Sequence, residues 1–417
     1  MRPNDPAAPA TPRGQTFRAL RYRDFRLLWI GLIVSAVGTW MQIIAQSLLV
    51  LRITHGSAIA LGIVSLAQAL AFFLFAFVGG AMADRVDKRR LLLVTQSLAA
   101  VLALILGVLA LTGVVQVWMI VFLAFCSGTV LSFDQPTRSS LIPLLVPPKD
   151  LMNAISLQSV IFNGASVVGP ALGGVAVGLI GIPGNFFLNA FSFVGVLVAL
   201  WLIKVPAAAA AAATERRGPF IESVRAALKT VAKDPVLPWL LSGYGALLFL
   251  GPSPALMLPV YATQILHLDP IQLGFLFTAS GLGTIVGALT IATLGDVKRK
   301  GRLVLGALLL WSVALAFFGL SKVLPLSIVG LAFYGLAQNG VGATTVTLLQ
   351  TRVPPAMRGR VMSLNTLLVM GVRPLGDFPA SLLITGIGAP FTVLVSAVLV
   401  GVYTVYLIVA RPAVRKV

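Results

Sequence analysis

Charge and cysteine are both scarce in this chain. Of its 417 residues only 10% are charged and 12 are acidic, whereas 58% are hydrophobic. A soluble domain carries far more charge than this, so the composition favours a membrane protein. Cys126 is the single cysteine, which excludes a disulfide framework and a cysteine metal centre.

Motifs that would power or catalyse a reaction are missing as well. No phosphate-binding Gly-x-x-x-x-Gly-Lys-Ser/Thr loop exists, because the nearest approach, Gly295 to Gly301-Arg302, lacks the lysine and the hydroxyl. The chain has no His-Glu-x-x-His and no nucleophile elbow. We therefore expect no enzymatic activity, no cofactor and no metal. Any pumping must draw on an ion gradient, which we expect to be one of protons.

Long apolar runs are abundant, and twelve of them are long enough to cross a bilayer as helices. In the first half they lie near 26–51, 58–83, 91–112, 115–141, 151–182 and 186–203. In the second half they lie near 236–263, 271–295, 303–321, 325–350, 362–387 and 390–410. The predicted fold class is an all-α membrane protein with six transmembrane helices in each half.

A short charged loop occurs twice, once in each half. Residues 84–91 read Asp-Arg-Val-Asp-Lys-Arg-Arg-Leu, and residues 296–303 read Asp-Val-Lys-Arg-Lys-Gly-Arg-Leu. The same shift places His55 on His267. Two homologous bundles of this kind are the architecture of secondary transporters, whose halves rock about a site between them. The predicted parts are a disordered cytoplasmic arm (1–16), two bundles (17–203 and 236–411), a linker with an amphipathic helix (204–235) and a tail (412–417).

The basic residues lie almost entirely on one side of this twelve-helix arrangement. All of the 31 lysines and arginines except Arg52, Lys322 and Arg373 fall in the termini or in loops on that side. The positive-inside rule then predicts a multi-pass protein of the cytoplasmic membrane with both termini in the cytoplasm. Short loops between spans do not form a nucleic-acid surface. We expect the partners to be the lipid bilayer and a small-molecule substrate, with no nucleic acid, and we expect a monomer.

The first charged loop has the composition of a conformational latch. Gly80 and Asp84 precede a basic cluster, and an acid at the end of one helix can lie against the positive N-terminal end of a neighbour. Pairs made by the cluster could hold one conformation and break when the halves rock. The simpler alternative is a basic loop that serves topology alone. The latch candidates are Gly80, Asp84, Arg85, Lys88, Arg89, Arg90 and Asp296.

The segment from Gly80 to Arg90 resembles the loop 2–3 signature of the major facilitator superfamily. It departs from the usual pattern at Asp87, where a second glycine is commoner, and the second copy has Ala292 in place of the glycine. Three further stretches resemble the branch that contains enterobactin-type siderophore exporters and macrolide or multidrug exporters. They are Gly38-Thr39-Trp40-Met41-Gln42, Thr54-His55-Gly56-Ser57-Ala58, and Pro147-Pro148 followed by Asp150-Leu151-Met152-Asn153-Ala154.

The fifth predicted helix contains Gly169-Pro170-Ala171-Leu172-Gly173-Gly174. Small residues let helices approach closely, and proline removes a backbone hydrogen bond and permits a bend. The segment resembles the Gly-Pro-x-x-Gly-Gly element of exporters of the drug/proton antiporter kind, which implies export. The alternative is ordinary close packing, as in any membrane helix. The candidate residues of this element are Gly169, Pro170, Gly173 and Gly174.

Two pairs of ionisable residues fall inside predicted helices, where buried charge is costly and therefore points to function. Asp134 and Arg138 flank Pro136, and Arg373 and Asp377 flank Pro374. Residues four apart lie one turn apart, so each pair could neutralise itself in a purely structural role. In the functional interpretation Asp377, or with less support Asp134, takes up a proton, weakens its hold on its arginine and couples proton entry to rocking.

Uncharged polar side chains supply candidates for a substrate cavity, although each could equally make an interhelical hydrogen bond. They are Gln42, Gln46, Asn163, Gln338, Asn339 and Asn365. Because fixed charges are few, we expect an amphipathic or weakly charged substrate. The predicted function is secondary active transport, as a proton-coupled antiporter that exports drug-like or siderophore-like molecules. The alternatives are an uptake permease for a small metabolite and a non-transporting membrane receptor or scaffold.

Overall fold

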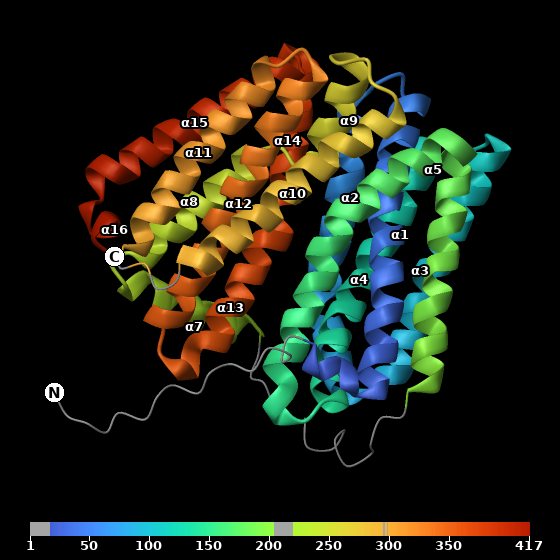
Figure 1. Ribbon diagram of the computed structural model, residues 1–417, viewed down its shortest axis with the longest axis horizontal. Coiled ribbons are helices and arrows are strands. Elements are labelled where there is room, and N and C mark those ends of the chain that lie inside the picture. Colours follow the sequence, from blue (N-terminus) through green and yellow to red (C-terminus); the bar gives the residue numbers. More distant parts are fainter. Residues whose placement is uncertain (1–16, 204–219, 295–296, 298) are drawn as a thin grey trace.

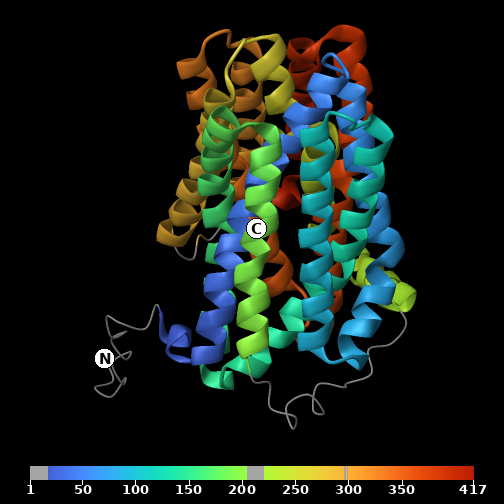
Figure 2. The same cartoon turned by 90° about the vertical axis from the view of Figure 1, so that its right-hand side faces the viewer.

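The computed structural model describes residues 17–203, 220–294, 297 and 299–417. Two helical bundles lie side by side, the N-terminal half in blue to green and the C-terminal half in yellow to red (Figure 1). Most long helices run along one common direction (Figure 2). The described residues contain no strand, so the predicted all-α class is confirmed.

Five long helices form the N-terminal half, together with the 3₁₀ turns η1 (Arg18–Arg21) and η2 (Pro148–Asp150). They are α1 (Arg23–Ile53), α2 (Ala58–Arg85), α3 (Lys88–Thr112), α4 (Val117–Leu145) and α5 (Leu151–Leu202). α5 holds two spans, because Gly181 has a φ of 74° and breaks the regular helix there. Only glycine adopts such a backbone without strain.

The C-terminal half begins with the short helix α7 (Phe220–Lys233) and continues, in the described part of the chain, through ten further helical elements. They are α8 (Leu237–Leu250), α9 (Pro254–Gln264), α10 (Pro270–Leu294), α11 (Lys300–Leu320), α12 (Leu324–Arg352), α13 (Pro355–Leu367), the π-helical turn η3 (Leu368–Val372), α14 (Arg373–Ile387), α15 (Ala389–Ala410) and α16 (Pro412–Lys416). Within the described residues eleven stretches are long and apolar enough to span a bilayer, and one of them is the double span Pro148–Leu202. Twelve crossings are consistent with this result.

The sequence repeat is visible in the backbone. His55 and His267 both adopt the left-handed conformation, with φ of 53° and 49°, and are the only described residues other than glycine to do so. Each follows the end of a helix, α1 in one half and α9 in the other. We call the end of the molecule that carries these two turns the distal end, and the end where Ile203 and Phe220 lie the linker end.

Two spans that the sequence predicted as continuous helices are interrupted. The seventh span breaks between α8 and α9 at Gly251, Pro252 and Ser253, because prolines at 252 and 254 remove backbone donors and disfavour helix in the residue before each. Ser253 then caps α9 by accepting from the Leu256 N–H at 3.2 Å. The eleventh span passes through the π-helical turn η3 in the middle of its length.

The amphipathic helix α7 packs on the C-terminal half. Its apolar residues Ala227 and Val231 are buried with Val361 of α13, so part of the apolar face of this helix packs on the C-terminal half. Asp234 follows α7 and accepts from the N–H groups of Val236 and Leu237 at 2.8 and 3.0 Å. These bonds and the Arg352 guanidinium at 2.9 Å outweigh the upward effect of partial burial, so the pKa of Asp234 lies below its usual range.

The buried apolar residues show where the two halves meet. The largest cluster joins them at the distal end and includes Ile44 and Leu61 of the first half and Leu256 and Leu273 of the second. Two smaller clusters at the linker end each belong to one half, one around Leu157 and Leu200 and one around Val361. The halves thus share a core at the distal end and have separate cores at the linker end.

Candidate functional site

A central cavity of about 420 Å³ lies between the halves. Most of its wall comes from α1 to α5, and the second half adds the α8–α9 break, Met370 and Asp377. It extends from Val50 and Leu61, near the distal end, to Arg138 on the linker side. Because the halves share a core only at the distal end, that end closes the cavity.

The polar part of the wall is built mainly from amides and hydroxyls. Gln42 accepts a hydrogen bond of 2.5 Å from the side chain of Asn189, and both line the cavity. Of the six predicted cavity residues, Gln42 and Gln46 line it, whereas Asn163, Gln338, Asn339 and Asn365 do not. Further polar residues that were not predicted also line the cavity, among them Ser65, Gln68, Gln96, Gln135, Asn189 and Ser253. An isolated glutamine or asparagine within an apolar span was the signal that could have found most of them.

Asp134 and Arg138 form the ion pair that their spacing predicted. Asp134 is 3% exposed and also accepts from the Gln96 side chain at 2.6 Å and from the Thr95 hydroxyl at 3.2 Å. All four residues belong to α3 and α4 of the same half. The pair is therefore a neutral, hydrogen-bonded unit on the cavity wall.

Asp377 has a different environment, although it is equally buried, with 3% exposure. Its carboxylate accepts from the Ser253 N–H at 2.8 Å, at the start of α9, and from the Ser65 hydroxyl at 3.2 Å. Ser65 lies on α2 of the opposite half, so Asp377 connects the two halves. Among the described residues no basic group lies within ion-pair distance of it.

Arg373 therefore makes no ion pair with Asp377. The structural alternative, in which this pair neutralises itself, is wrong for this helix, and so is the part of the functional interpretation in which Asp377 holds Arg373. The Arg373 guanidinium donates to the Gln338 side chain at 3.0 Å, on α12 of its own half. Each residue has its partner on another element. The α8–α9 break supplies a free N–H group that donates to Asp377, and α12 supplies the amide oxygen that accepts from Arg373. Helical spacing alone did not contain that information.

The contacts of the first charged loop lie within one half. Asp87 caps α3 by accepting from the Arg90 N–H at 2.8 Å, which explains an aspartate at this position of the loop. Arg89 donates to the carbonyl oxygens of Leu200 and Trp201, both at 2.5 Å, and so ties α3 to the end of α5.

Several latch candidates make no contact that would hold the halves together. Lys88 is buried and Arg85 is exposed, neither of them with a hydrogen bond or ion pair in the described part of the chain. A methyl group at Gly80 would meet open space. Asp296 and the side chain of Asp84 lie outside the described residues, so the latch remains a prediction.

The Gly-Pro-x-x-Gly-Gly element lies where α5 meets two other helices. A Cβ at Gly173 would lie 2.9 Å from the Met41 Cα of α1, whereas one at Gly174 would lie 2.3 Å from the Pro270 carbonyl oxygen of α10. Asn185, fully buried, donates to the Gly173 carbonyl at 3.0 Å. The element thus packs α5 against its own half and, through Gly174, against the opposite half.

These features define a membrane transporter of the major facilitator fold, with two six-helix halves, a cavity between them and close contacts at one end. A family profile described as transmembrane secretion effector matches residues 14–417, so the chain belongs to that family of major facilitator proteins. This is a class of transporters, and it is not enzymatic. The predicted superfamily is confirmed.

Curated relatives support the resemblance to siderophore exporters. Enterobactin exporter EntS of Citrobacter koseri is 28% identical over 374 residues, which cover 89% of this chain and 87% of that protein. EntS of Escherichia coli O1:K1 / APEC is 27% identical over the same shares of the two chains. The resemblance to that branch is confirmed.

Solved structures share the fold at much lower identity. A POT family transporter superposes with a TM-score of 0.73 at 13% identity, covering 94% of this chain and 97% of the other. A bacterial homologue of the iron transporter ferroportin gives 0.71 at 18% identity, covering 92% and 98%. At these identities the likeness supports the fold alone.

Proposed function

We propose that this protein exports drug-like or siderophore-like amphipathic molecules from the cytoplasm in exchange for protons. The observation that carries the proposal is the position of Asp377, an acidic side chain that lines the cavity and hydrogen-bonds across the interface between the halves. In this proposal the linker end, which carries the basic loops, faces the cytoplasm in the cytoplasmic membrane. The protein works as a monomer, and it needs no cofactor beyond the ion gradient.

In alternating access, the Asp377 carboxylate is exposed to only one side of the membrane at a time. When the halves separate at the distal end, α2 leaves α14 and the carboxylate meets outside water, from which it takes a proton. When the distal end closes, the neutral acid is buried without the cost of an unpaired charge. It then faces the cavity, and the proton leaves to the cytoplasm as substrate enters.

The cavity wall favours a substrate with little net charge. Asp134 and Arg138 neutralise one another, Asp377 is neutral when it carries the transported proton, and most of the other polar groups are amides and hydroxyls. Such groups offer both donors and acceptors to a molecule that is also apolar. The relationship to enterobactin exporters favours siderophore-like compounds among the candidates.

The test is transport by the purified chain in proteoliposomes with an imposed proton gradient. Export predicts that a lipophilic dye, antibiotic or catechol siderophore crosses against the direction of proton flow and that a protonophore abolishes the movement. The same experiment tests the alternative of an uptake permease, because rocking halves can carry substrate either way. Movement of substrate with the proton flow would replace the exporter by that permease. No movement with any compound would overturn the proposal.

A further inference from the structure

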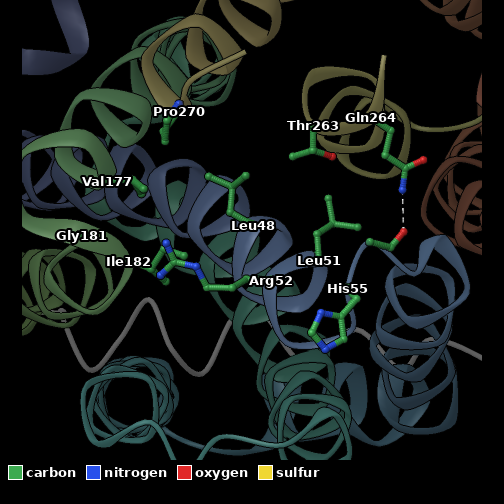
Figure 3. A pocket seen from close by; sticks show the side chains of 11 residues that line it. Leu48, Leu51, Arg52, His55, Val177, Gly181, Ile182, Thr263, Gln264 and Pro270 are labelled. Atoms are coloured by element: carbon green, nitrogen blue, oxygen red, sulfur yellow. Dashed lines mark hydrogen bonds between the residues drawn. The ribbon is translucent and has the colours of Figure 1, made fainter. Parts of the chain in front are cut away.

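A second cavity, of about 550 Å³, lies at the distal end and is separate from the central one. Figure 3 shows its wall, in which Leu48 and Leu51 of α1 and Pro270 at the start of α10 surround an open space. Val177 and Ile182 of α5 complete the apolar part. Residues of both halves therefore build this pocket.

The ionisable groups that line the pocket are Arg52 and His55. Arg52 is exposed and has neither a carboxylate nor a hydrogen-bond partner in the described part of the chain. An unpaired guanidinium beside apolar side chains is suited to a ligand that carries one anionic group on an apolar body. A volume of this size accommodates a small organic molecule.

The rim of the pocket is a contact between the halves. Gln264 at the end of α9 donates to the Gly56 carbonyl oxygen at 2.7 Å, as the dashed line in Figure 3 shows. Gly56 has a φ of 93°, and a Cβ there would lie 2.9 Å from the Gln264 side-chain nitrogen. The pocket in this form thus exists only while the distal end is closed.

We propose that this distal pocket, lined by Arg52, His55 and residues of both halves, binds a small amphipathic anion and thereby holds the distal end closed. A ligand that binds one conformation better than another shifts the population toward it. The consequence for transport rests on the proposed function, in which the distal end faces outside. Ligand added outside would then inhibit export.

Cysteine protection tests binding without any transport. In a Cys126→Ser background, Thr263→Cys places a thiol in the pocket for labelling by a membrane-impermeant maleimide. We expect external 2-naphthalenesulfonate to slow labelling at least fivefold, and the neutral 2-naphthalenesulfonamide to have little effect. Arg52→Gln should remove the protection. Lys322→Gln, which removes the other exposed cation predicted on this side, should retain it.

The contrary outcomes are distinct. A thiol that labels at the same rate with and without sulfonate, or that does not label from outside, would overturn the site. Equal protection by the sulfonamide would overturn the anionic class of ligand. Protection without inhibition of an established transport activity would overturn the closing of the distal end. An exported anion that protects the same thiol would identify the transported molecule itself as the ligand, in place of an unrelated external compound.

Discussion

Two acid–arginine pairs with the same spacing, each with a proline between its members, behave differently in the two halves. Asp134 and Arg138 bind each other, and their additional contacts come from α3 of the same half. Asp377 and Arg373 are separated in their bonding, and Asp377 reaches Ser65 of the opposite half. A pair confined to one half moves with it as a rigid body. A group bound across the interface must change partners whenever the halves rock.

The largest effect should come from Asp377→Asn. Asparagine preserves the shape and can still accept from the Ser253 N–H, but it cannot carry a proton. Proton-driven transport in proteoliposomes should fall by at least about tenfold, which corresponds to ~1.4 kcal/mol, while the amount of folded protein stays the same. Substrate exchange without a gradient is the control and should persist. Undiminished proton-driven transport would remove Asp377 from the coupling step.

Asp134→Asn should lower stability and not proton coupling, because it breaks an ion pair with a structural role. It leaves Arg138, whose side chain is 15% exposed on the cavity wall, without its counter-ion, at a cost of about 1–3 kcal/mol in stability. A fall in the thermal unfolding temperature in detergent measures this cost. Adding Arg138→Gln should recover much of it. If Asp134→Asn alone is as stable as the parent, the ion pair does not contribute to stability.

Two glycine substitutions distinguish a contact between the halves from a contact inside one half. Gly174→Ala places a methyl group against the Pro270 carbonyl of the opposite half, so closing of the distal end should become unfavourable by about 1–3 kcal/mol. Transport should slow with little change in unfolding temperature. Gly128→Ala, which meets the Gln68 carbonyl within one half, should instead lower the unfolding temperature. Gly164→Ala, with open space around it, is the control, and equal behaviour of Gly174 and Gly164 would contradict the contact.

Ser65→Ala removes one hydrogen bond between the halves. The expected shift is about 0.5–1.5 kcal/mol toward separation at the distal end, which is a change of roughly two- to tenfold in the population. Faster labelling of Thr263→Cys, in the Cys126→Ser background, would report it. Ser127→Ala makes the same chemical change in the same cavity, at a hydroxyl without a bonded partner in the described chain, and should leave the labelling rate unaltered.

The smallest effect concerns Asp234, at the linker end and outside the spans. Because its pKa is lowered in the folded protein, its stabilisation is complete above the unfolded value near 3.9 and is lost as the pH falls through the folded value. Asp234→Asn keeps the acceptor for the two N–H groups but removes the ion pair with Arg352, so it should cost roughly 0.2–1 kcal/mol near pH 7. The variant and the parent should converge in unfolding temperature as the pH falls below the folded pKa of Asp234. A constant difference down to that pH would show that the charge is irrelevant.

Much of the fold could be predicted from apolar length, loop charge and the repeat. The predicted helix near 58–83 is α2 in the structure, and the one near 390–410 is α15, each within a few residues. These features depend on the bilayer, which imposes the same length on every span. The breaks at Gly251–Ser253 and in η3 could not be predicted from hydrophobicity, because neither interrupts an apolar run.

The site was predicted in part. Gln42, Gln46, Asp134, Arg138 and Asp377 do line the central cavity. Arg373 and the amides of the C-terminal half do not, because a polar residue on a helix shows neither which way it faces nor which helix it meets.

The membrane environment, the twelve-span organisation and the family could be read from the amino-acid sequence, because they follow from composition and local pattern. The hydrogen bond from Ser65 of one half to Asp377 of the other, and the position of Arg52 beside a pocket built by both halves, became visible only in the folded protein. Such contacts join residues far apart in the chain. Their geometry depends on how whole helices pack, and no local pattern encodes it.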